Sequence, residues 1–134
     1  MSRREMREHI FKLLFLMEFY EENELSEQAE LYMDEVEEAA PSGKDAEYIL
    51  EKYRKICEQL PQLDEKLTKA ATGWKLNRMN KVDLSILRLA TYEAVEDDDI
   101  PVGVAINEAV ELAKKFGGDD SPAFVNGVLA KVVK

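Results

Sequence analysis

The sequence predicts an all-α protein of about seven helices. Apolar residues recur at spacings of three and four along most of the chain, which is the period of an amphipathic helix. No segment shows the sustained alternation of apolar and polar residues that is typical of a half-buried strand. Capping residues, prolines and glycines divide the chain at intervals that suit short helices. The 134 residues fit a single domain or two closely packed subdomains.

The first helix is predicted to span Arg3–Tyr20 and to carry two apolar stripes. One stripe is mainly aliphatic. The other consists of Phe11, Phe15 and Phe19, which continue the line of Arg7 at four-residue spacing. Two stripes fit a helix that is buried within the monomer, which is the default, or a helix that gives one stripe to a partner. A line of arginines that runs into a line of aromatic rings also suits single-stranded RNA, because arginine neutralises phosphate and rings stack on bases.

Three helices are predicted in the middle of the chain: Ser26–Ala40, Ala46–Leu60 and a shorter one that Pro61 opens. Ser26 is the expected N-cap of the first, and the run from Pro41 to Gly43 is expected to stop it. The shorter helix is expected to end before Gly73.

A linker with large apolar side chains follows Gly73. We interpret Trp74, Leu76 and Met79 as plugs of the core rather than as a platform for a ligand. Asn80 followed by Asp83 resembles a capping box for a helix over Val82–Val95. That helix is predicted to be mostly buried, because apolar residues surround most of it.

The C-terminal segment predicts two helices joined by a tight connector. Pro101 suits the first position of a helix that ends near Phe116, since the missing N–H of proline costs nothing there. Gly117 and Gly118 follow, where a left-handed helix cap is expected. Ser121 is the natural N-cap of the last helix.

Gly127 lies in the middle of that last helix, where glycine costs ~1 kcal/mol relative to alanine. Our first interpretation is that another helix packs closely against it. The alternative is that Asn126 and Gly127, with Phe124 one turn earlier, present an accessible edge to a ligand.

The chain is strongly acidic, with a net charge of −10 and a pI of about 4.7. This charge argues against a non-specific nucleic-acid binder, which needs a broad basic surface. Acidic residues crowd positions 18 to 58, whereas Arg3, Arg4, Arg7 and Lys12 cluster near the N-terminus. A run of acidic residues is usually a solvated face, and the basic cluster is therefore the less expected feature.

Catalytic and metal-binding motifs are absent from the sequence. His9 and Cys57 are each the single residue of their type, which excludes an internal disulfide and leaves a metal site without ligands. There is no Ser-His-Asp order and no Gly-rich phosphate loop. We therefore expect a protein that is not an enzyme and has no metal or cofactor. No secretory signal and no apolar run of membrane-spanning length is visible, which predicts a cytoplasmic protein without a membrane partner.

Two stretches, INEAVELAKKFGGDDSPAFVNGVL and DLSILRLATYE, strongly resemble the NusB family of bacterial transcription antitermination factors. The resemblance extends from Arg3 nearly to the C-terminus, and its C-terminal block is the most specific part. It implies one NusB-like domain over residues 1–134, built from two small helical bundles packed across each other. The expected subdomains are residues 1–72 and 73–134, with the break near Gly73.

The resemblance also implies a function. NusB proteins bind the boxA element of nascent transcripts as a heterodimer with NusE, a ribosomal small-subunit protein, and the complex helps RNA polymerase to resist termination. The matching positions assign RNA contact to arginines, aromatic residues and two polar residues, namely Arg3, Arg4, Arg7, Phe116, Asp120, Ser121 and Phe124. They assign Phe15 and Asp83 to the surface that faces NusE. The alternative is a helical adaptor or homodimer of the same fold that binds protein and no RNA.

Overall fold

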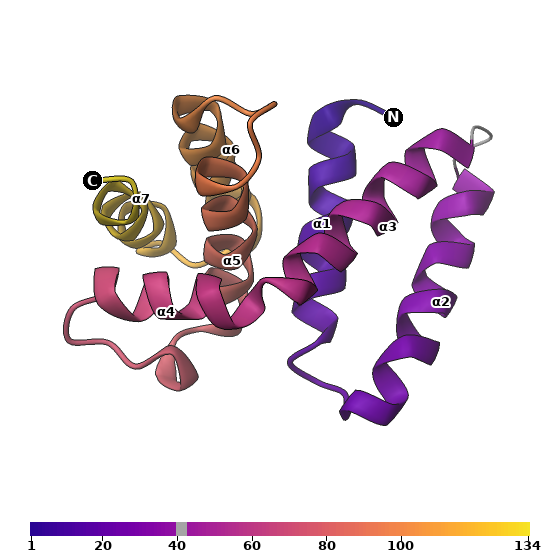
Figure 1. Cartoon of the computed structure of the whole chain (residues 1–134), viewed down its shortest axis with the longest axis horizontal. Helices are drawn as coiled ribbons and strands as arrows, with labels where there is room; N and C mark the ends of the chain where they lie inside the picture. The colour runs from indigo at the N-terminus through magenta and orange to yellow at the C-terminus, as the bar shows by residue number, and fades with distance from the viewer. Residues whose placement is uncertain (40–42) are drawn as a thin grey trace. The chain divides into compact units, whose positions relative to one another are not determined.

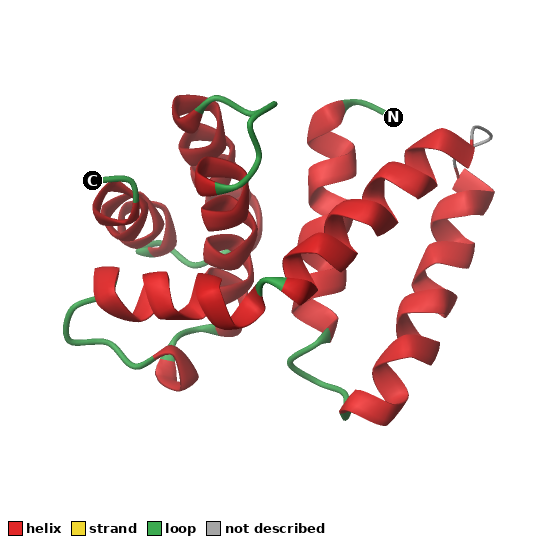
Figure 2. Cartoon of the chain, in the orientation of Figure 1, coloured by secondary structure: helices red, strands yellow, loops and turns green. Residues whose placement is uncertain are grey.

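The structure is a computed structural model that describes residues 1–39 and 43–134. Across these residues the regular structure consists of seven α-helices and one short 3-10 helix, with no strand (Figure 2). The all-α prediction is confirmed. The chain divides into two compact units, Met1–Cys57 and Glu58–Lys134.

The first unit contains α1 (Arg3–Leu16), α2 (Glu22–Ala39) and α3 (Gly43–Glu58) (Figure 1). A capping box begins α1: the Ser2 hydroxyl accepts from the Glu5 backbone N–H, and the Glu5 carboxylate accepts from the Ser2 N–H. Buried apolar side chains come from all three helices: Ile10, Phe11, Leu13, Leu14, Met33, Val36, Ala46, Ile49, Tyr53 and Ile56.

Two helix ends of this unit differ from their predicted positions. α1 ends at Leu16 rather than at Tyr20, because the chain tightens there into i→i+3 hydrogen bonds such as Phe19 N–H to Leu16 C=O. Ser26 is not an N-cap, since α2 already begins at Glu22, where the acidic first turn complements the positive end of the helix. The predicted last residue of this helix, Ala40, and the first two residues of its predicted stop, Pro41 and Ser42, lie outside the described residues, while Gly43 begins α3.

The second unit contains α4 (Leu60–Ala70), η1 (Leu76–Arg78), α5 (Lys81–Val95), α6 (Val102–Phe116) and α7 (Ser121–Val132). Helix α5 packs against α4, α6 and α7 and is buried along most of its length, as predicted. The Arg88 guanidinium of α5 donates from Nε and one terminal nitrogen to the two carboxylate oxygens of Asp64 on α4, both at 2.9 Å. This two-bond geometry fixes α4 against α5.

The division between the two units follows Cys57, whereas the sequence predicted a break near Gly73. Helix α4 contacts α5 and α7, and it therefore belongs to the second unit. Gly73 instead makes the turn after α4, with a φ of 85°, a conformation that favours glycine over any residue with a Cβ.

Candidate functional site

A cavity of about 360 Å³ lies in the second unit, between the segment that contains η1 and the connector from α6 to α7. Four of the residues predicted to contact a ligand or partner line it: Asp83, Asp120, Ser121 and Phe124. The remaining lining residues are Trp74, Met79, Asn80, Gly118 and Asp119. Residues that the sequence assigned to two different surfaces thus meet around one cavity.

The connector that forms one wall depends on Gly117. A Cβ on this residue would lie 2.5 Å from the Ser121 Cβ and 2.8 Å from the Ala113 carbonyl oxygen. The predicted left-handed cap is wrong, because Gly117 is extended, with φ −92° and ψ −174°. Close approach to Ser121 is the reason for glycine here.

Helix α7 begins one residue earlier than predicted, so Ser121 is not its N-cap. Asp120 is the N-cap and makes no side-chain capping hydrogen bond, whereas Ser121 is the first helical residue. The buried Ser121 hydroxyl accepts from the Gly118 backbone N–H at 3.0 Å and so closes the connector on itself. The Asp120 carboxylate is left exposed beside the cavity.

Two aromatic rings form another part of the lining. Trp74 and Phe124 pack edge to face, with ring centroids 5.4 Å apart and an interplanar angle of 65°. Trp74 is 54% exposed, and its interpretation as a core plug is wrong, whereas Met79 is buried as expected. Phe124 is half-buried, and the exposed ring of the pair offers a face on which a flat group can stack.

Asp83 is the buried carboxylate of the cavity. It is 8% exposed, and its Oδ1 has no hydrogen-bond partner. The predicted capping box is half formed: Asn80 Oδ1 accepts from the Val82 and Asp83 backbone N–H groups. Asp83 is thus among the lining residues, while its Oδ1 has almost no accessible surface.

The charge of the lining restricts what the cavity can hold. Three carboxylates face or border it, those of Asp83, Asp119 and Asp120, and none of its lining residues is basic. A phosphate group would be repelled there, while a group that donates hydrogen bonds would be favoured.

Phe116 is not part of the cavity lining. It ends α6, is partly exposed, and has the Lys115 ammonium 5.4 Å from its ring centroid. A cation near an aromatic face is a favourable arrangement that also keeps a positive charge beside the connector.

The predicted arginines lie in the first unit, at the start of α1. Arg3 and Arg4 are exposed, whereas Arg7 is buried, with 8% of its surface exposed. Ser2 lowers the pKa of Glu5, mainly through a hydrogen bond from its backbone N–H and secondly through its hydroxyl. Glu5 therefore stays charged among these arginines. The first turn of α1 is thus ordered and offers two exposed cations.

The aromatic stripe of α1 runs from the interior to the surface. Phe11 is buried, Phe15 is half-buried, and Phe19 is 56% exposed. The Phe15 ring centroid lies 6.2 Å from that of Phe11 and 4.8 Å from that of Phe19. The inner end of the stripe is therefore buried within the protein, and its outer end is exposed and available to a partner.

Comparison with known proteins decides the family. A model of the NusB family matches residues 4–134. The chain belongs to the NusB family. The transcription antitermination protein NusB of Lachnoclostridium phytofermentans is 56% identical over 133 residues, which cover 99% of each chain. That of Agathobacter rectalis is 54% identical over 131 residues, which cover 98% of each.

Solved structures agree with this assignment. T. maritima NusB has a TM-score of 0.88 at 38% identity and covers 99% of this chain and 91% of its own. A structure of the antitermination factors NusB and NusE in complex with dsRNA has a TM-score of 0.84 at 22% identity, which shows the same fold. The predicted resemblance to the NusB family is confirmed.

Trp74 is the site residue that the sequence prediction missed. Its position directly after Gly73, in a linker rather than in a periodic segment, was the available signal. Within residues 1–39 and 43–134, no cluster of three His, Cys, Asp or Glu side chains is placed to hold a metal ion. No helix among the same residues is long and apolar enough to cross a membrane.

Proposed function

We propose that this NusB-family chain acts in transcription antitermination by binding boxA-like single-stranded RNA together with NusE. The observation that carries the proposal is the cavity between Trp74, Phe124 and Asp120, where an aromatic pair of one exposed and one half-buried ring stands beside hydrogen-bond acceptors. Unpaired bases are recognised in this way, by stacking on rings and by hydrogen bonds to their edges.

The relatives support this function. Curated proteins that align over nearly the whole chain are transcription antitermination proteins, and a protein of the same fold forms a complex with NusE and dsRNA. In the proposed complex the chain joins the antitermination assembly of RNA polymerase on a nascent transcript, which places it in the cytoplasm.

Two parts of the chain supply the RNA contacts in this proposal. Arg3 and Arg4 neutralise phosphates from the exposed start of α1, and Arg7, which is 8% exposed, lies one turn further along the same helix. Phe124 stacks on a base, while Asp120 accepts from its edge and Ser121 keeps the connector in shape. Phe116 adds a partly exposed ring beside the Lys115 cation.

The partner surface in this proposal includes the outer end of the aromatic stripe. Phe15 and the exposed Phe19 present apolar area that association with NusE would bury. Self-association through the same stripe is the competing use of this surface, and sedimentation of the free chain tests it.

The single tryptophan makes the proposal measurable. Trp74 lies against Phe124, and a base that stacks there will change the tryptophan fluorescence. Phe124→Leu keeps apolar volume and removes the ring, and it should weaken boxA binding by ~1–3 kcal/mol, the value of one stacked base. Phe124→Tyr keeps the ring and should bind as the wild type does.

Titrations of both variants with boxA-like RNA and with scrambled RNA, with and without NusE, test the proposal. Equal affinity of the Leu and Tyr variants for boxA RNA would show that no base stacks on residue 124, and a wild type that binds neither RNA would reject the function itself.

A further inference from the structure

A groove of about 540 Å³ lies between α2 and α3 in the first unit. Its floor is apolar, since Met33 of α2 and Tyr53 of α3 are buried there. Half-buried apolar side chains border this floor, namely Leu25, Ala29 and Leu50. Figure 1 shows the two helices diverging with distance from the end of α2 and the start of α3. The bordering side chains thus keep apolar surface that neither helix covers.

Carboxylates form the rim of this groove. Its lining includes four exposed acidic residues of α2 and one exposed cation of α3, namely Glu22, Glu30, Asp34, Glu37 and Arg54. The excess of negative charge attracts cationic side chains and repels nucleic acid. A second copy of this chain is disfavoured as an occupant for the same reason, because its net charge is −10.

We propose that the groove docks a helix of a partner protein, with an apolar face towards the floor and lysine or arginine side chains at the acidic rim. Amphipathic helices bind apolar grooves in this way, through anchors spaced at i, i+3, i+4 and i+7. The flexible side chain of Met33 suits such anchors, because methionine adapts to irregular shapes. Phe15 and Asp83, which are predicted to face NusE, do not line the groove. This docking surface is therefore additional to the one proposed for NusE.

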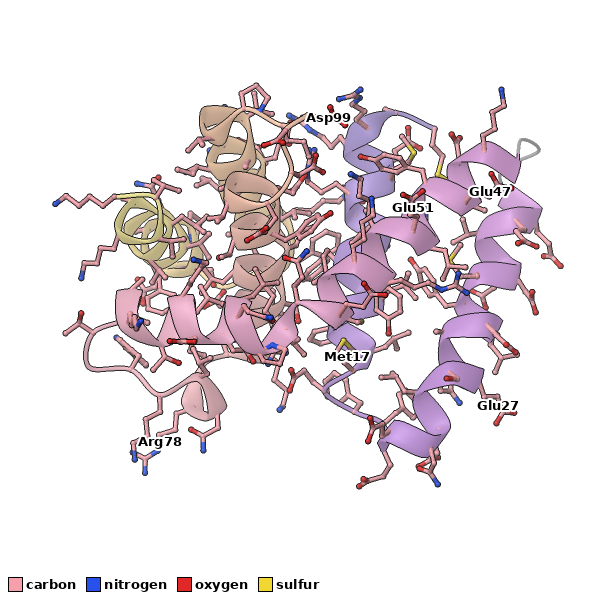
Figure 3. The ribbon with its side chains drawn as sticks, in the orientation of Figure 1. Met17, Glu27, Glu47, Glu51, Arg78 and Asp99 are labelled. Atoms are coloured by element: carbon pink, nitrogen blue, oxygen red, sulfur yellow. The ribbon has the colours of Figure 1, made fainter. Side chains whose placement is uncertain are left out.

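Other acidic residues of α2 provide a matched control for the rim. Glu27 and Glu35 are exposed but do not line the groove, and the Glu27 side chain projects away from α3 (Figure 3). Glu30 and Asp34 lie one turn apart on the same helix and line the groove. Neutralising either pair changes the net charge equally. A difference between the two pairs therefore reports contact in the groove rather than long-range attraction.

The test titrates the full chain, without RNA or NusE, with a labelled synthetic peptide helix that has leucines along one face and lysines on its flanks. One control peptide has the same composition in scrambled order, and the other has glutamates in place of the lysines. Fluorescence anisotropy should show binding of the first peptide and roughly tenfold weaker binding, or none, of both controls.

Substitutions in the chain locate the bound peptide. The double variant Glu30→Gln, Asp34→Asn should bind it roughly threefold to tenfold more weakly, because two ion pairs at the rim are lost. The double variant Glu27→Gln, Glu35→Gln should bind as the wild type does. Ser26 is exposed and lines the groove, and Ser26→Trp should abolish binding by filling it, with the thermal midpoint unchanged.

Four outcomes would overturn the inference. The first is a wild type that binds no peptide, or all three equally, a result that needs no variant to fold. The second is an equal loss of affinity in the two double variants. The third is a folded Ser26→Trp chain that still binds the peptide. The fourth is displacement of the peptide by NusE, which would assign the groove to the NusE surface. Because these titrations contain no RNA, the proposed function is tested separately by the boxA titrations.

Discussion

Two side-chain oxygens among the described residues are buried without a hydrogen-bond partner, Asp83 Oδ1 and Thr91 Oγ1. Their surroundings differ. Asp83 borders the cavity with its Oδ1 itself buried, whereas Thr91 is completely buried in α5. An unpaired polar group in a packed core lowers stability, because no hydrogen bond offsets the cost of removing it from water.

Thr91→Val should therefore stabilise the protein. Valine has nearly the shape of threonine and replaces an unpaired hydroxyl by a methyl group, which removes a desolvation cost of ~1 kcal/mol or more. Chemical denaturation of the variant should show a higher midpoint with an unchanged slope, and boxA affinity should stay the same. A lower midpoint would mean that the hydroxyl is bonded in solution.

His9 should make stability depend on pH. Burial, followed by the charge of Lys12, lowers the pKa of His9 from its ordinary 6.5, and its Nδ1 lies 2.6 Å from the Tyr32 hydroxyl. Burial also raises the pKa of Tyr32 to about 12, and that hydroxyl remains a donor. Because the unfolded chain binds the His9 proton more tightly, this contribution is present above pH 6.5 and is lost as the pH falls through the lower, folded-state pKa.

Thermal midpoints at several pH values between about 7.5 and 5 measure this contribution. The wild type should lose more stability on acidification than His9→Gln, which cannot be protonated. Identical pH profiles of the two proteins would show that His9 does not titrate with unfolding.

At the scale of the helices and their connectors, two glycines have opposite roles. Gly127 lies in the exposed middle of α7, and a Cβ there would meet nothing within 4 Å. The interpretation that another helix packs closely against Gly127 is therefore wrong. The alternative interpretation, that this part of α7 presents an accessible edge to a ligand, stays a prediction. Gly117 by contrast has no room for a side chain next to Ser121.

Matched alanine substitutions separate these roles. Gly127→Ala should raise the free energy of unfolding by ~0.5–1 kcal/mol, because it removes backbone freedom from the unfolded chain. Gly117→Ala should lower it by ~1–3 kcal/mol, since the connector must shift to admit the methyl group. Urea denaturation of both variants measures the two changes in the free energy of unfolding. Changes of the same sign in both variants would contradict the structure of the connector.

The sequence predicts the order of the helices because each has its own apolar stripe and its own end signals. It does not predict which large side chain is exposed, since that depends on contacts distant in the chain. Trp74 and Arg7 illustrate this: the apolar ring is exposed and the charged group is buried. The cavity itself arises only when α7 brings Phe124 to Trp74. The resemblance supplied Asp120 and Phe124 as site residues, but their placement around one cavity with Asp83 required the structure.

At the scale of the whole molecule, a net charge of −10 limits how RNA can be held. Arg3 and Arg4 are exposed in the first unit, and the second unit adds the exposed cations Lys75, Arg78, Lys114 and Lys115. Few phosphates can be neutralised by so small a set, and the acidic residues of α2 repel a strand at long range. Stacking, base-edge contacts and a second protein must therefore provide much of the affinity.

The dependence of boxA affinity on salt tests this account most directly. For single strands the slope of log affinity against log salt is ~0.7 per neutralised phosphate. We predict a shallow slope for the chain alone, tighter binding of boxA than of scrambled RNA, and a marked gain in affinity when NusE is added. A steep slope for the chain alone, with equal affinity for boxA and scrambled RNA, would show a general polyanion binder and contradict the account.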